Sequence, residues 1–134
     1  MPKCILIVDD EPTQRRLLEE VIKRLGYQTR TASSGEDAIS VLEAEADQFS
    51  LVLLDLMMPD VDGMAVLDRV AMRADIPPVI VQTAHGSIDS AINAMRAGAV
   101  DFVIKPASPE RLDVSIKSAL KMKALSGEIT RMRK

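Results

Sequence analysis

The chain has 134 residues, of which 47% are hydrophobic and 28% charged, and its formal net charge is −3. These values are typical of one globular domain that buries its own core, and they lack the basic excess of a nucleic-acid-binding segment. Cys4 is the only cysteine, which excludes a disulfide within the chain. No stretch approaches the roughly 20 apolar residues of a membrane span, and an apolar run begins too early for a signal peptide. We therefore expect a cytoplasmic protein without a membrane segment.

Short β-rich runs alternate with segments of helical pattern along the chain. Strands are predicted at 4–8, 28–32, 51–54, 78–81 and 100–104. Five β–α units in succession predict a parallel sheet with right-handed crossovers and helices on both faces. We expect an α/β fold of the flavodoxin-like, doubly wound type, with three layers and strand order 2-1-3-4-5.

Helical patterns fill the segments between these strands. The first has one apolar face, made of Leu18, Val21, Ile22 and Leu25. Pro12 lies near its start and Gly26 directly after its end, as is common at helix termini. The fourth, expected from about 87 to 97, places four residues on one face: Ile88, Ala91, Ile92 and Met95. The last opens with Ser108 as N-cap and Pro109 at the first helical position.

Charged and polar residues lie at the carboxyl ends of four of the predicted strands. Asp9 and Asp10 follow the first strand, Asp55 the third, Thr83 the fourth and Lys105 the fifth. The carboxyl ends of parallel strands meet at one edge of the sheet, where open α/β folds bind ligands. The expected strand order brings the first two aspartates beside Asp55.

Such an acidic cluster predicts a metal-assisted phosphoryl chemistry. Carboxylates held together repel one another unless a cation lies among them, and Mg²⁺ prefers oxygen ligands and phosphate. One carboxylate can then attack a phosphoryl group and form an aspartyl phosphate. Lys105 and Thr83 would offer positive charge and a hydrogen-bond donor to the phosphoryl oxygens.

Each of these residues also has a simpler interpretation when taken alone. An aspartate after a strand is often the N-cap of the next helix, Lys105 and Pro106 could form a surface turn, and His85 could be a solvated loop residue. Phe102 on an apolar run is core by default. Their co-occurrence at four strand ends favours a functional site.

Four segments carry a family resemblance: ILIVDDEP at 5–12, LDLMMPDVDGM at 54–64, TAHG at 83–86 and AGAVDFVIKP at 97–106. In this order they resemble the receiver domain of bacterial two-component response regulators, over about residues 3–122. The resemblance implies that Asp55 accepts a phosphoryl group from a sensor histidine kinase. It implies Mg²⁺ bound by Asp10, Asp55 and the main-chain carbonyl of Met57, with Asp9 acting through water.

The resemblance also assigns roles to residues around the phosphate. Lys105 would pair with the acceptor carboxylate and then with its phosphate, while the Thr83 hydroxyl moves toward the phosphate and Phe102 follows as the switch aromatic. Pro106 would be a turn residue whose peptide bond with Lys105 is a cis candidate. Met57 and His85 would flank the phosphate and tune its hydrolysis. Because Met57 cannot position a water molecule, we expect a long-lived phosphoryl state.

The C-terminal segment predicts a link to a further domain. Residues 1–122 would form the receiver domain, and 123–134 a helical linker toward an output domain in the same chain. Apolar residues in 3-4-3 spacing, typical of a coiled-coil seam, are Met122, Leu125, Ile129 and Met132. We expect a homodimer formed through the last helix and the fourth-strand face.

The class within the family is indicated by shorter motifs. The runs at 83–87 and 94–98 resemble the nitrogen-regulator class, whose receivers control activators of the sigma-54 polymerase and hence transcription. Ala107 stands where a phenylalanine is common, which departs from the family pattern.

Three other functions remain alternatives. A phosphatase of the haloacid-dehalogenase type also forms an aspartyl phosphate, but it needs an acid two residues after its nucleophile and a cap domain; here Glu11 follows Asp9 by two. A flavodoxin-like cofactor binder needs a loop rich in Ser, Thr and Gly after its first strand. A degenerate receiver would lack one of the expected site residues.

Overall fold

The computed structural model describes residues 3–56, 63–71, 77–83, 88–105 and 107–132, with the backbone alone at 71 and 122–132. Its elements in chain order are β1 (Cys4–Val8), α1 (Pro12–Arg24), β2 (Gln28–Ala32), α2 (Gly35–Glu45), a short 3-10 helix (Ala46–Gln48), β3 (Leu51–Asp55), α3 (Gly63–Ala71), β4 (Val79–Thr83), α4 (Ile88–Arg96), β5 (Asp101–Ile104) and α5 (Pro109–Met132). The strands form a parallel sheet in the order β2-β1-β3-β4-β5, which confirms the predicted fold.

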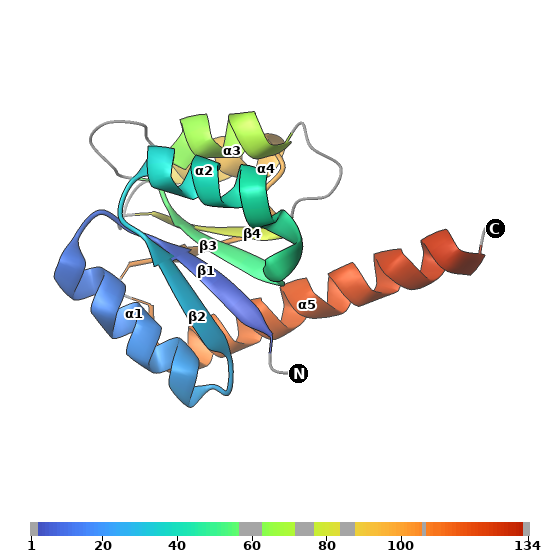
Figure 1. Ribbon diagram of the computed structural model, residues 1–134, viewed down its shortest axis with the longest axis horizontal. Helices are drawn as coiled ribbons and strands as arrows, with labels where there is room; N and C mark the ends of the chain where they lie inside the picture. Colours follow the sequence, from blue (N-terminus) through green and yellow to red (C-terminus); the bar gives the residue numbers. More distant parts are fainter. Residues whose placement is uncertain (1–2, 57–62, 72–76, 84–87, 106, 133–134) are drawn as a thin grey trace.

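The sheet separates two apolar layers. Helices α1 and α5 cover one face, and α2, α3 and α4 cover the other (Figure 1). Side chains alternate between these faces along each strand, as the pleat requires. In β1, Ile5 and Ile7 face α1 and α5, whereas Leu6 and Val8 face the other three helices. The same alternation determines which face of the sheet each site residue occupies.

The helix ends follow the sequence signals. Pro12 is at the start of α1, and Gly26 after its end has a φ of 101°, a conformation that glycine adopts without strain. The Ser108 hydroxyl accepts a hydrogen bond from the Arg111 N–H at 3.1 Å, so it caps α5 as predicted.

Helix α4 packs differently from the prediction. Its buried residues are Ala91 and Ala94, while Ile88, Ile92 and Met95 are 49%, 45% and 40% exposed. At 3.6 residues per turn, the buried stripe is displaced by roughly a quarter turn from the predicted face. The two alanines let the helix lie close to the sheet, so the larger apolar side chains project outward from this helix.

Helix α5 continues past the sheet and carries the C-terminus away from the other elements (Figure 1). Four of its residues, Leu112, Ile116, Ala119 and Leu120, pack on the α1 side of the sheet, whereas Val114 is exposed. In the part of the chain that the structure describes, no helix combines the length and the apolar character that a membrane crossing requires.

Candidate functional site

The carboxyl ends of β1, β3, β4 and β5 form one edge of the sheet. Parallel pairing aligns Val8 with Leu54 and Asp55 with Gln82, so Asp9 follows β1 directly beside Asp55. The Asp9 N–H donates to the Ala32 carbonyl at 3.2 Å, which fixes the backbone where β1 ends. Because side chains alternate along the strands, Asp9 and Asp55 both face α1 and α5.

Three carboxylates meet at this edge. Oxygens of Asp9, Asp10 and Asp55 all lie within 4.8 Å of one another. Asp9 is fully buried, Asp55 is 2% exposed, and Asp10 is partly buried. Negative charges this close and this shielded from water raise the free energy of the folded state unless cations compensate them. The predicted acidic cluster is therefore present in the fold.

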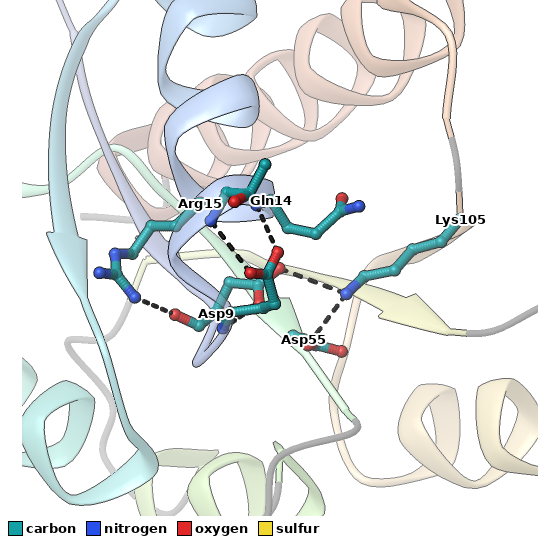
Figure 2. Close-up of polar contacts among 7 residues, drawn as sticks. Asp9, Gln14, Arg15, Asp55 and Lys105 are labelled. Carbon is teal, nitrogen blue, oxygen red and sulfur yellow. Dashed lines mark hydrogen bonds and ion pairs between the residues drawn. The ribbon is translucent and has the colours of Figure 1, made fainter.

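Lys105 supplies one compensating charge from the end of β5. Its Nζ lies 2.9 Å from Asp55 Oδ2 and 3.2 Å from Asp9 Oδ2, so one ammonium bridges two carboxylates (Figure 2). Burial by itself would lower the pKa of Lys105, but the hydrogen bond to Asp55 and the charges of Asp55 and Asp9 outweigh it and raise that pKa. The Lys105 N–H also donates to the Thr83 carbonyl at 2.8 Å, which ties β5 to β4 at the site.

Glu11, the N-cap of α1, and Arg15 on α1 hold Asp9 in place. Its Oδ1 accepts from the Glu11 N–H at 3.0 Å, and its main-chain carbonyl accepts from Arg15 Nη1 at 2.9 Å. Figure 2 shows Arg15 reaching back from the first turns of α1 to this carbonyl. Asp9 is thus fixed through both its side chain and its backbone.

The N-cap of α1 is Glu11, and neither aspartate has that role. Its carboxylate accepts from the N–H groups of Thr13 at 3.2 Å and Gln14 at 2.8 Å. The hydrogen bonds from Gln14 and Thr13 also lower the pKa of Glu11. Since Glu11 satisfies the helix terminus, Asp9 and Asp10 remain available for the cluster, and the interpretation of them as helix caps is wrong.

Thr83 and Phe102 lie on the opposite face of the sheet edge. Thr83 is 2% exposed at the end of β4, and Phe102 packs against the layer formed by α2, α3 and α4. In the β4–β5 register Phe102 pairs with Val81, two residues before Thr83, so both side chains project from the same face of adjacent strands.

Gly63 lets the start of α3 approach the end of β3. A Cβ added there would lie 2.5 Å from the Asp55 carbonyl oxygen and 2.5 Å from Leu56 Cα, both of which are backbone atoms. The Gly63 N–H donates to the Leu56 carbonyl at 3.3 Å. The sequence shows this glycine after an aspartate, which indicates a turn, but the close backbone approach is visible only in the fold.

Three predicted site residues, Met57, His85 and Pro106, lie outside the described residues. Two contributors were missed by sequence reasoning: Arg15, which holds the Asp9 carbonyl, and Gln82, a buried amide between Asp55 and β5. Arg15 gives no sequence signal among the neighbouring charges of α1. Gln82 does give one, because it is the single amide within an otherwise apolar run.

The donor set fits a magnesium ion. The cluster offers three carboxylates, and Lys105 contacts two of them, Asp9 and Asp55. Hard oxygen ligands from one or two carboxylates, with the remaining positions open to water and phosphate, are typical for Mg²⁺. Asp10, the least buried of the three carboxylates, is the natural ligand on the solvent side.

Comparisons with known proteins agree with this geometry. The family model described as response regulator receiver domain matches residues 5–117. The chain is 41% identical over 119 residues to a probable transcriptional regulator ycf27 of Cyanophora paradoxa, covering 89% of this chain and 48% of that protein. It is 35% identical to the regulatory protein AtoC of Escherichia coli, covering 93% of this chain and 27% of AtoC. The crystal structure of NtrX from Brucella abortus superposes with a TM-score of 0.90 at 33% identity, covering 98% of this chain and 30% of NtrX. The chain thus spans half or less of the length of these relatives.

Proposed function

Since the chain belongs to the family of response regulator receiver domains, we propose that it accepts a phosphoryl group on Asp55 from a sensor histidine kinase. The observation that carries this proposal is the buried Asp55 carboxylate, paired with Lys105 at 2.9 Å and set beside two further carboxylates. A buried nucleophile with an adjacent ammonium and a cation site matches the needs of phosphoryl transfer.

The transfer forms one bond and breaks another. An Asp55 carboxylate oxygen attacks the phosphorus atom, and the bond between phosphorus and the histidine nitrogen of the kinase breaks, leaving its electron pair on that nitrogen. Asp10, Asp55 and the Met57 carbonyl would hold Mg²⁺, with Asp9 acting through water, and the bound ion would supply positive charge to the phosphoryl oxygens. Lys105 then exchanges its contact with the carboxylate for one with the phosphate. Met57 offers no group that positions water, so hydrolysis of the adduct is slow.

The placement of Thr83 and Phe102 on one face supports a switch. The phosphate draws the Thr83 hydroxyl toward it, and Phe102 on the same face moves into the space that Thr83 leaves. This favours one of two existing states and reshapes the surface of β4, α4 and β5. The domain that binds this surface is an output domain in the same chain, which fits the greater length of the relatives.

The similarity to NtrX and AtoC supports the nitrogen-regulator class, with transcription controlled through a sigma-54 activator in the cytoplasm. The motifs at 83–87 and 94–98 point the same way. Glu11 argues against the phosphatase alternative, because both of its carboxylate oxygens cap α1 and neither serves as an acid in the cluster.

We further propose a homodimer that involves α5 beyond residue 122 and the exposed apolar stripe of α4. Truncation after Lys121 keeps Leu120, the last core residue among the described side chains, and removes the predicted coiled-coil seam. The full chain is expected to give a dimer mass in light scattering at high concentration, and the truncated chain a monomer mass. Equal masses for both would contradict a dimer through this helix.

The proposed chemistry is tested by intact-mass measurement after incubation with acetyl phosphate and Mg²⁺. The wild type is expected to gain the mass of one phosphoryl group, whereas Asp55→Asn gains none, because an amide is a poor nucleophile. Following the decay of the adduct after removal of the donor measures its lifetime. An adduct of equal yield on Asp55→Asn would place the acceptor elsewhere.

A further inference from the structure

A cavity of about 250 Å³ lies between α1 and α5, behind the acidic cluster. Most of its wall is apolar, and its polar side chains are Gln14, Gln82 and Lys105. Figure 2 shows the Gln14 side chain extending from α1 toward Lys105, and both residues line this cavity. The cavity therefore adjoins the residue that bridges Asp9 and Asp55.

Gln82 is placed between the phosphoacceptor and the strand that carries Lys105. In register it pairs with Asp55 on β3 and with Val103 on β5, two residues before Lys105. Val103 and Ile80 belong to the apolar layer of α1 and α5, so the alternation of β4 directs Gln82 to that same face. At 1% exposure, its amide is cut off from bulk water.

The amide nitrogen of Gln82 has no hydrogen-bond partner among the described residues. An unpaired buried donor lowers stability, and an apolar side chain of similar shape would avoid this loss. Lys105 in the same cavity carries three ammonium hydrogens, of which the two carboxylates use two. The Gln82 amide and the Lys105 ammonium therefore both place a hydrogen-bond donor in this cavity.

We propose that Gln82 is a positioning residue for Lys105. Its amide nitrogen donates to a water molecule in the cavity, the carbonyl oxygen of the Gln14 side chain accepts from that water, and the oxygen of the water accepts the third hydrogen of Lys105. A water oxygen has two lone pairs, one for Gln82 and one for Lys105, and the site offers the polar partners that a buried water needs.

The function of this arrangement rests on the proposed phosphoryl transfer. The hydrogen bond to this water keeps the Lys105 ammonium oriented toward the position where the phosphoryl oxygens develop charge. Without the water it would still pair with Asp9 and Asp55 but would sample more orientations. Gln82 thus acts on the reaction through Lys105.

The test replaces Gln82 with methionine, which has a similar length and no donor. With acetyl phosphate and Mg²⁺, Gln82→Met is expected to be phosphorylated about tenfold more slowly, as misorientation of a reacting group predicts. Its midpoint of thermal unfolding should equal or exceed that of the wild type. In ¹⁵N-labelled protein, the ammonium hydrogens of Lys105 should give a slowly exchanging signal in the wild type that disappears in Gln82→Met.

Controls separate positioning from packing. Ile80→Met alters the same face of β4 two residues earlier and should leave both the rate and the Lys105 signal unchanged. In a Lys105→Met background, Gln82→Met should cause no further loss of rate. Gln82→Leu serves as a second variant if methionine disturbs the fold.

The outcomes are distinct. An unchanged rate in Gln82→Met, or an equal loss in the Lys105→Met background, would overturn the positioning role while leaving the phosphoacceptor intact. A wild type that gains no phosphoryl group would instead refute the proposed function itself.

Discussion

Replacing Lys105 with methionine is expected to lower the free energy of unfolding by about 3 kcal/mol in metal-free buffer. The variant leaves the carboxylates of Asp9 and Asp55 buried and adjacent, without the ammonium that bridges them. Mg²⁺ should restore part of this loss, because a bound cation would replace the missing charge. Urea unfolding with EDTA and with Mg²⁺ measures both effects.

The same substitution should slow phosphorylation by about 100-fold, since it removes a donor aimed at the transferred oxygens. Lys117→Met is the matched control. That lysine is 69% exposed and pairs with Asp113 on the surface of α5, so its loss should change stability by no more than about 0.5 kcal/mol. If both variants lost the same amount of stability, the ammonium of Lys105 between the two buried carboxylates would not stabilise the fold.

Gly63→Ala is expected to lower both stability and phosphoryl acceptance. The new Cβ would lie 2.5 Å from backbone atoms of Asp55 and Leu56, so the backbone after β3 must shift. We expect a loss of about 3 kcal/mol, at the upper end of overpacking effects. Because the displaced backbone carries the acceptor, the rate of phosphorylation should fall as well. Thermal unfolding and intact-mass kinetics on one preparation test both.

Gly26→Ala provides the comparison. Gly26 has a φ of 101° and no atoms within 4 Å of an added Cβ, so alanine introduces conformational strain without a clash. We expect a loss of about 1 kcal/mol from this strain and an unchanged phosphorylation rate, since Gly26 lies at the other end of α1 from the cluster. A normal rate in Gly63→Ala would show that the close approach does not position Asp55.

The fold could be predicted from the sequence because local and long-range signals agree. Continuous apolar strands such as β3 need cover on both faces, and short β–α units leave few topologies for a parallel sheet. Asp9, Asp10, Asp55 and Lys105 could be located because strand ends are visible in the sequence. The strand order then brings those ends together.

Other features depend on tertiary packing and left little trace in the sequence. Glu11 caps α1 although glutamate is an uncommon cap, because Asp9 and Asp10 are held in the cluster. Helix α4 lies on the sheet through Ala91 and Ala94, and the stronger apolar signal of Ile88 and Ile92 belongs to its exposed side. Hydrophobic periodicity identifies a helix but does not tell which of two adjacent stripes is buried.

The claim that the three aspartates hold one cation is tested most directly by calorimetric titration of Mg²⁺ into the wild type and into Asp10→Asn. The wild type is expected to bind one ion per chain and to gain about 2.7 kcal/mol of stability at 100 times the dissociation constant. Asp10→Asn, with one charged ligand fewer, should bind at least tenfold more weakly. A wild type that takes up no Mg²⁺, or a variant that binds it equally well, would contradict a metal site at this edge of the sheet.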